Sequence, residues 1–419
     1  MNLRDFRRAG HLPTLIAAFL YFDVSFMAWM LVGALANAIA LSLGGLSDAQ
    51  KGLMVAVPVL GGSILRLVLG PLADHIGARR TGLIGMTMTL LPLLLGWLWA
   101  DSFARVLLIG LLLGVAGASF AAALPLAGRW YPPQYQGLAL GIAGAGNSGT
   151  ALATFFGPHL AERYGWHAVF GLALIPLLLV LIVFARYAQD SPHQPPPKSM
   201  ADYLAVLRLR DTWWFCLFYA VTFGGFVGLA SFLSIFFHDQ YGLTKVQAGG
   251  FTTLCVVAGS FLRPVGGHLA DRLGGIRLLA LLYLGEAAAM LALSTLPPLS
   301  WATLLLFVGM GLLGMGNGAV FQLVPQRFPR EIGVLTGLVG AAGGLGGFVL
   351  PNALGLLKGW TGSFGGGFLA FGFAIFGSAL ALGIVGRSWQ GAFVSRGGCA
   401  ATEAEPGPAG WLWDMGSSA

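Results

Sequence analysis

Two arginines deep in apolar runs are the residues of this chain most suited to chemistry. Arg66 and Arg263 lie in runs of almost entirely apolar residues, and an aspartate follows each of them eight residues later, Asp74 and Asp271. A charged side chain in hydrocarbon is costly, so by default it faces a protein interior or a water-filled cavity and marks a functional site. Their matching positions in the two halves of the chain indicate a site built by duplication.

The chemistry that this arginine pair predicts is anion binding. No acidic residue lies one helical turn from Arg66 or Arg263 on its own segment. Two uncompensated guanidinium groups repel each other, and an anion between them removes that penalty. Each guanidinium also presents a planar fork of donors suited to oxyanions. The alternative is that each arginine pairs with a helix-end carbonyl, with Asp23 or with Glu286.

Glycine-rich stretches accompany the arginines in both halves. Glycines recur at spacings of three and four in the apolar runs 138–160 and 334–356, which makes one face of each predicted helix nearly bare backbone. Such a face allows close helix contact and sliding between neighbours, although ordinary glycine-mediated packing explains most of these positions. Asn147 stands out because it places an amide in the middle of a bare face. The glycines expected to allow sliding are Gly144, Gly146, Gly149, Gly340, Gly343 and Gly344.

The composition predicts a helical membrane protein. Of the 419 residues, 57% are hydrophobic and 9% are charged, whereas a soluble domain carries about a quarter charged residues. A transmembrane β-barrel would need segments of about ten residues with alternating polarity, and the runs here are longer and apolar on all sides. Three cysteines, Cys216, Cys255 and Cys399, form neither a disulfide framework nor a metal-ligand spacing.

Apolar runs long enough to span the roughly 30 Å hydrocarbon core predict twelve transmembrane helices. A proline-rich polar segment divides them into an N-terminal six-helix bundle (1–187), a cytoplasmic linker (188–211) and a C-terminal six-helix bundle (212–390), followed by a polar tail (391–419) that we expect to be disordered and cytoplasmic. The predicted spans are 12–42, 50–72, 81–99, 104–127, 138–160, 168–187, 212–237, 247–270, 278–296, 301–325, 334–356 and 366–386.

The distribution of basic residues predicts the orientation. With the N-terminus in the cytoplasm, most of the 23 lysines and arginines fall on the cytoplasmic side, as the positive-inside rule requires. The C-terminus then also lies in the cytoplasm. This bias accounts for the net charge of +7 without any nucleic acid partner.

The repeated loop resembles a known superfamily. The stretch Gly70-Pro71-Leu72-Ala73-Asp74 through Arg80 recurs as Gly267-His268-Leu269-Ala270-Asp271 through Arg277. This glycine–aspartate–basic pattern resembles the signature loop of the major facilitator superfamily, where it is a conformational motif. The resemblance implies two pseudo-symmetric bundles with a cavity between them, across which Arg66 and Arg263 face each other.

A narrower resemblance follows from several features together. The Gly146-Asn147-Ser148-Gly149 stretch, the glycine-rich run 334–356 and the two arginines look like the nitrate/nitrite porter family. That resemblance implies that Arg66 and Arg263 clamp the anion, that Asn147 donates a hydrogen bond to it, and that Phe120, Tyr219 and Phe223 form aromatic walls. Tyr219 and Phe223 are four residues apart and therefore share a helix face. Aromatic walls with donors at the edges suit a small planar monoanion.

The sequence leaves the coupling open. Asp23, in the first predicted span, is the candidate proton-coupling residue, with a structural role as the alternative. Glu286 lies on the ninth span, which is peripheral in this fold, so we expect it to pack against a neighbouring helix. We expect proton-coupled nitrate import, with nitrate/nitrite exchange as the alternative.

The expectation is therefore a transporter of nitrate and nitrite in the cytoplasmic (inner) membrane, a monomer in the lipid bilayer, with protons as a further candidate substrate. A facilitator for another anion and a non-transporting membrane sensor are the rival interpretations. We expect no cofactor and no metal. An enzyme is disfavoured because the sequence has no metal-ligand cluster, no nucleophile paired with histidine and no phosphate-binding loop after a strand.

Overall fold

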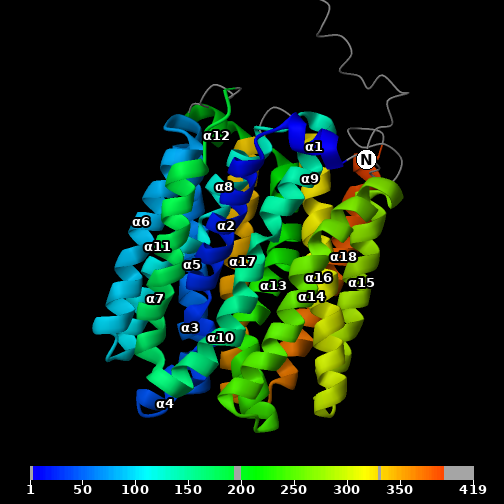
Figure 1. Ribbon diagram of the computed structural model, residues 1–419. Coiled ribbons are helices and arrows are strands. Elements are labelled where there is room, and N and C mark those ends of the chain that lie inside the picture. Colours follow the sequence, from blue (N-terminus) through cyan, green and yellow to red (C-terminus); the bar gives the residue numbers. More distant parts are fainter. Residues whose placement is uncertain (1–2, 193–199, 329–331, 391–419) are drawn as a thin grey trace, which may run out of the picture.

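The computed structural model describes residues 3–192, 200–328 and 332–390, and these are helical almost throughout (Figure 1). The predicted disordered tail, 391–419, lies outside the described residues. Two short helices lie at one end of the molecule, α1 (Leu3–Ala9) and α12 (Met200–Leu207). Helix α12 falls within the segment that the sequence predicts to be a polar linker.

Two sets of helices follow the two halves of the chain. The first half contains α2 (Leu12–Trp29), α3 (Leu31–Ala34), α4 (Ala36–Ser42), α5 (Asp48–His75), α6 (Ala78–Leu98), α7 (Phe103–Gly117), α8 (Phe120–Gly128), α9 (Pro133–Gly144), the 3₁₀ helix η1 (Ala145–Ser148), α10 (Gly149–Tyr164) and α11 (Trp166–Tyr187). The second half contains α13 (Arg210–Tyr241), α14 (Lys245–Leu273), α15 (Gly275–Leu293), α16 (Leu299–Arg327), α17 (Ile332–Thr361) and α18 (Gly365–Trp389).

Eleven segments in the described part of the chain are long and apolar enough to cross a membrane, with α7 and α8 together counted as one. The predicted span 138–160 is divided into α9, η1 and α10, the span 104–127 into α7 and α8, and the span 12–42 into α2, α3 and α4. Glycine destabilises a helix interior by about 1 kcal/mol relative to alanine, and Gly141, Gly144, Gly146 and Gly149 crowd the first of these breaks. The described helices agree with the predicted fold of two six-helix bundles.

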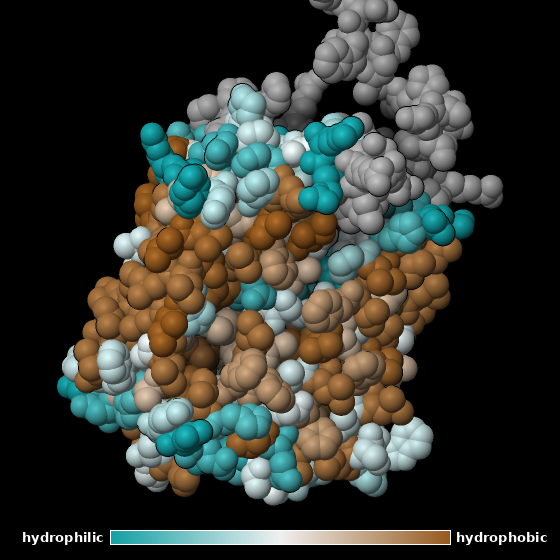
Figure 2. Space-filling view, in the orientation of Figure 1, coloured by the Kyte–Doolittle hydropathy of each residue, from teal (hydrophilic) through white to brown (hydrophobic). Residues whose placement is uncertain are grey.

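The outer surface has the polarity of a membrane protein. Figure 2 shows a broad apolar band across the middle of the face in view, with hydrophilic residues gathered at its two ends. Large apolar side chains on the outer helices are exposed, for example Leu98 and Ile182. Lipid covers such side chains in a transmembrane protein, so their exposure here is not a folding defect.

The two motif aspartates, Asp74 and Asp271, do not lie where the sequence predicts. The sequence predicts that Asp74 and Asp271 lie in loops, but both lie in the last turn of a helix, α5 and α14 respectively. The helices continue past the apolar runs because nothing before the following glycine breaks them. Gly77 and Gly274 then adopt a φ of 93°, a backbone conformation that favours glycine, and the chain turns there.

Direct contacts between the two halves run from the end of the molecule opposite α1 and α12 to its middle, where the Ser63 hydroxyl of α5 donates to the Ala341 carbonyl of α17. The ammonium of Lys51 lies 2.6 Å from the carboxylate of Asp239, joining α5 to α13. The side-chain amide of Asn37 donates to the Ser234 carbonyl at 2.8 Å. These contacts hold the two bundles closed at that end.

Inside each half, paired glycines bring helices to near backbone contact. A Cβ added at Gly114 of α7 would lie 2.2 Å from the carbonyl carbon of Gly61 in α5. The second half repeats this packing, because a Cβ at Gly314 of α16 would lie 2.0 Å from the Gly259 oxygen in α14. Each arginine-bearing helix is thus positioned by a glycine contact one to two turns before the arginine.

Replacing Gly114 by alanine should destabilise the protein. The added methyl group meets backbone that no side-chain rotation can relieve, and such overpacking costs about 1–3 kcal/mol. We expect a clearly lower Tm for Gly114→Ala in detergent solution. The matched control is Gly250→Ala in α14, where an added Cβ meets nothing within 4 Å. Equal Tm values for the two variants would show that the close approach of α5 and α7 does not limit stability.

Candidate functional site at the arginine pair

Arg66 and Arg263 occupy equivalent places in α5 and α14, and both side chains are buried. Arg66 is 0% exposed and Arg263 is 8% exposed. Each lies in the last third of its helix, roughly 14 Å from the helix end at a rise of 1.5 Å per residue. In the described part of the chain no carboxylate lies within ion-pair distance of either guanidinium.

Arg66 donates to two backbone carbonyls. Its Nε and Nη2 donate to the Gly117 carbonyl at 3.1 and 2.9 Å, and its Nη1 donates to the Gly340 carbonyl at 2.6 Å. Gly117 is the last residue of α7, so its carbonyl has no helical partner. Arg66 therefore pairs with a helix-end carbonyl, which is one of the alternatives to anion binding that the sequence leaves open. Because Gly340 belongs to α17, this side chain also links the two bundles.

Arg263 makes fewer hydrogen bonds than Arg66. Its Nη2 lies 3.4 Å from the Tyr219 hydroxyl, a long and weak hydrogen bond. Its Nη1 is buried and has no partner among the described residues. Arg263 therefore keeps donors that are free to bind a ligand.

Aromatic rings surround the two guanidinium groups. The ring of Phe120 lies 5.6 Å from the guanidinium carbon of Arg66 and 5.6 Å from that of Arg263, so both arginines approach one ring. The Arg66 carbon also lies 4.8 Å from the ring of Phe223 and 5.4 Å from that of Trp29. These distances lie within the range of cation–π attraction.

Tyr219 and Phe223 lie on one face of α13, with their ring centroids 5.0 Å apart and their planes 8° apart. The predicted sharing of a helix face is confirmed. Phe321 of α16 meets Tyr219 edge-on at 4.9 Å and Phe120 at 5.7 Å. Phe321 thereby connects the aromatic groups of the two halves.

Asn147 lies in η1 and is fully buried, and neither polar atom of its amide has a hydrogen-bond partner in the part of the chain that the structure describes. An added Cβ at Gly144, three residues earlier, would lie 3.9 Å from Nε of Arg263. Residues three apart eclipse each other in a 3₁₀ turn. This segment therefore runs past Arg263, and Asn147 follows one turn later.

The sequence did not single out four further residues at this site. Trp29 and Phe321 supply rings, Gly117 supplies a carbonyl, and Asn317 of α16 lies one turn before Phe321. Asn317 is fully buried, and neither of its amide atoms has a hydrogen-bond partner within residues 3–192, 200–328 and 332–390. The signal that could have found it is the run Gly314-Met315-Gly316-Asn317-Gly318, which places an asparagine between glycines as the Asn147 segment does.

The six glycines expected to allow sliding fall into two groups. An added Cβ would meet atoms at 2.6–2.9 Å at Gly146, Gly343 and Gly344, and at 1.8 Å at Gly149. At Gly144 the nearest atom is Nε of Arg263, 3.9 Å away, and at Gly340 the nearest atoms are those of Arg66 and Phe120, 3.7 Å away. The first group packs tightly against its neighbours, whereas the second makes only ordinary van der Waals contact beside the arginines.

The candidate acids do not contact the arginines. The hydroxyl of Ser148 donates to Asp23 at 2.7 Å, and the Gly149 N–H also donates to this carboxylate. Asp23 thus joins α2 to the break in the fifth span, which agrees with the structural alternative for this residue. Glu286 packs between α15 and α16, where a Cβ at Gly309 would lie 2.9 Å from its Oε2.

The two motif aspartates have different surroundings. Asp74 accepts a charge-assisted hydrogen bond from Nη2 of Arg129. Asp271 is exposed at the end of α14. Among the described residues, no group of histidine, cysteine and carboxylate side chains is arranged to hold a metal ion.

Comparison with known proteins identifies the family. The model of the Major Facilitator Superfamily matches residues 17–351. The chain is 34% identical over 346 residues to the "Nitrite extrusion protein" of Bacillus subtilis, covering 82% of this chain and 87% of the relative. It is 33% identical over 388 residues to the "Probable nitrate/nitrite antiporter NarK1" of Thermus thermophilus, covering 85% and 87%.

A solved structure supports the same fold. The crystal structure of the D-xylose-proton symporter superposes with a TM-score of 0.72 at 16% identity, covering 88% of this chain and 97% of the symporter. Together with the helical architecture, these matches identify the protein as a multi-pass membrane transporter, in agreement with the expectation that it is not an enzyme. The chain belongs to the nitrate/nitrite porter family of the major facilitator superfamily.

Proposed function

We propose that the protein carries nitrate and nitrite across the cytoplasmic membrane, with the anion held between Arg66 and Arg263. The observation that carries this proposal is the burial of two guanidinium groups beside one ring, that of Phe120, without a carboxylate partner in the described chain. An unpaired buried charge is costly, and an anion between the two arginines offsets that cost. The names of the two bacterial relatives support nitrate and nitrite as the substrates.

The surroundings of the arginines suit a flat anion. The parallel rings of Tyr219 and Phe223 and the ring of Phe120 offer apolar faces, while the guanidinium groups, the Tyr219 hydroxyl and the Asn147 amide offer donors. Nitrate and nitrite are planar and weakly hydrated, so they can slide between ring faces and accept hydrogen bonds at their edges. We propose Asn317 as an additional donor, because it lies on the same helix as Phe321 and its buried amide has no partner among the described residues.

Alternating access follows from the same contacts. We assign the cytoplasm to the end bearing α1 and α12, which places both termini there and the contact between Lys51 and Asp239 on the outer side. The bundles 1–187 and 212–390, joined by the linker 188–211, would then rock about the midplane site. An anion that accepts from Nη1 of Arg66 competes with the Gly340 carbonyl, so binding weakens a link between the bundles.

Exchange of nitrate for nitrite is the coupling that we favour, with the protein working as a monomer. Asp23 is engaged by Ser148 and by the Gly149 N–H, which suits a structural role better than a proton carrier. Two fixed positive charges also favour a site that is always occupied by an anion. Proton-coupled import through Asp23 is the second candidate, and the pH-gradient measurement below separates the two.

Replacing either arginine by lysine should abolish most nitrate transport. Lysine keeps the charge but loses the planar fork, and hydrogen bonds to charged groups contribute about 1.5–3 kcal/mol, so we expect uptake into proteoliposomes to fall roughly tenfold to a hundredfold. Arg263→Lys is the cleaner test, because Arg66 also links α5, α7 and α17. The control is Arg163→Lys at an exposed position of α10. Near-normal uptake by folded Arg263→Lys protein would contradict the clamp.

Internal nitrite should drive nitrate uptake without a pH gradient. Proteoliposomes loaded with nitrite are expected to take up labelled nitrate at the same rate whether the internal and external pH are equal or differ by one unit. Asp23→Asn should retain this exchange, because an asparagine oxygen can still accept from Ser148. Uptake that requires an acidic exterior and disappears in Asp23→Asn would instead establish proton coupling.

Replacing Asn317 by leucine distinguishes a role of this side chain in nitrate binding from a role in helix packing. Leucine has a similar volume but no donor, so it should maintain or raise the Tm while raising the KM for nitrate about tenfold, the effect of losing one hydrogen bond to an anion. Asn352→Leu in α17 is the control, since the Asn352 amide already donates to the Phe348 carbonyl at 2.8 Å. An unchanged KM in Asn317→Leu would remove Asn317 from the site.

A further inference from the structure

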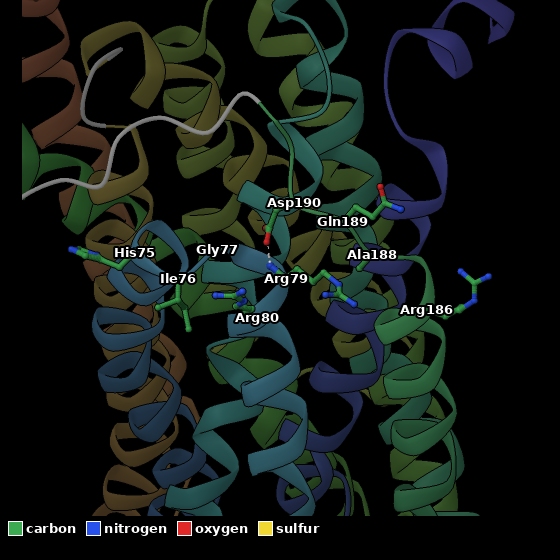
Figure 3. A pocket seen from close by; sticks show the side chains of 9 residues that line it. All are labelled: His75, Ile76, Gly77, Arg79, Arg80, Arg186, Ala188, Gln189 and Asp190. Carbon is green, nitrogen blue, oxygen red and sulfur yellow. Dashed lines mark hydrogen bonds between the residues drawn. The ribbon is translucent and has the colours of Figure 1, made fainter.

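A basic cavity lies at the end of the molecule that bears α12, away from the arginine pair. Its volume is about 510 Å³, and the last turns of α5 and α11, the start of α6 and the segment after α11 line it (Figure 3). Among its lining residues, Arg79, Arg80, Arg186 and His75 are basic, and Asp190 is the acid. The cavity therefore presents an excess of positive charge.

The acid in the cavity does not neutralise these arginines. The Asp190 carboxylate accepts from the backbone N–H of Arg79 at 2.9 Å, and Nη2 of Arg79 donates to the Ala185 carbonyl at 2.7 Å. Arg80 and Arg186 are exposed, and in the described chain neither is within ion-pair distance of a carboxylate. These two guanidinium groups remain available to an anionic ligand.

An exposed apolar surface continues directly from the two free arginines. Helices α6 and α11 pack together. One and two turns from Arg80 on α6, Ile84 is 40% exposed and Met88 is 53% exposed. One and two turns from Arg186 on α11, Ile182 is 65% exposed and Leu179 is 59% exposed. A ligand that meets both surfaces needs an anionic head and an apolar tail.

We propose that this cavity binds the headgroup of an acidic phospholipid whose acyl chains lie along α6 and α11. Basic pockets among transmembrane helices on the cytoplasmic side are suited to such headgroups, and each basic residue near the surface contributes about 1 kcal/mol. The apolar surface next to the cavity favours a lipid over a free phosphate, because a free phosphate has no acyl chain to cover that surface. This site is separate from the nitrate site and does not depend on the proposed transport function.

Lipid binding to the purified full-length protein tests the proposal by native mass spectrometry. The protein is titrated with phosphatidylglycerol, with phosphatidylcholine of the same acyl chains, and with glycerophosphoglycerol, which is the headgroup without tails. We expect retained adducts with phosphatidylglycerol, few with phosphatidylcholine, and no displacement of the lipid by the tail-less headgroup. Equal adducts with both lipids would overturn the proposal, and displacement by the tail-less headgroup would identify a soluble phosphate site instead.

The double variant Arg80→Gln/Arg186→Gln should bind phosphatidylglycerol about thirtyfold more weakly, since it removes two of these charge contributions. The matched control is Arg163→Gln. Arg163 lies 5.4 Å from the ring of the adjacent Tyr164, just as Arg186 lies 5.6 Å from the ring of Tyr187, but at the end of α10 rather than α11. Wild-type affinity in the double variant would overturn the assignment. Nitrate binding at Arg66 and Arg263, measured on the same purified protein, should persist in that variant, so the two proposals fail independently.

Discussion

The burial of two positive charges in an apolar interior is the constraint on which the rest of this structure depends. Arg66 and Arg263 cannot lose their charge by a modest change of environment, so the protein must surround them with acceptors or rings. It does so with backbone carbonyls for Arg66 and with aromatic faces for both residues. The breaks in the helices serve this requirement, because a helix that ends at Gly117 leaves a carbonyl without an internal partner.

The two arginines are equivalent in sequence but not in bonding. Arg66 is held by carbonyls from α7 and α17, whereas Arg263 has one weak bond to Tyr219 and a donor without a partner among the described residues. Both guanidinium groups lie beside the Phe120 ring, but that of Arg66 is held in place while that of Arg263 is less constrained. Since Arg66 also spans the bundles, any ligand that takes its donors acts on the contact between them.

Glycine makes this arrangement possible. The arginine-bearing helices approach their neighbours to backbone contact at Gly61 with Gly114 and at Gly259 with Gly314. Beside the arginines themselves, a Cβ at Gly144 or Gly340 would reach only ordinary van der Waals distance from its neighbours. Glycine therefore has two distinct physical roles here, which are close helix packing away from the arginines and uncrowded backbone next to them.

Sequence patterns alone were sufficient for the fold and for identifying the two buried arginines. The length of the apolar runs requires spanning helices, and the repeated arginine identifies paired sites, because hydrocarbon tolerates neither unpaired backbone nor unpaired charge. The breaks within 12–42, 104–127 and 138–160, the helical placement of Asp74 and Asp271, and the contributions of Trp29, Phe321 and Asn317 were not predicted. They depend on which faces of distant helices meet, and a single apolar residue in a membrane helix carries no signal of whether it faces lipid or a partner. The sequence by itself determined that two charges must be buried; only the tertiary structure decided that one is held by carbonyls of α7 and α17 while the other keeps free donors, because those acceptors come from segments far apart in the chain.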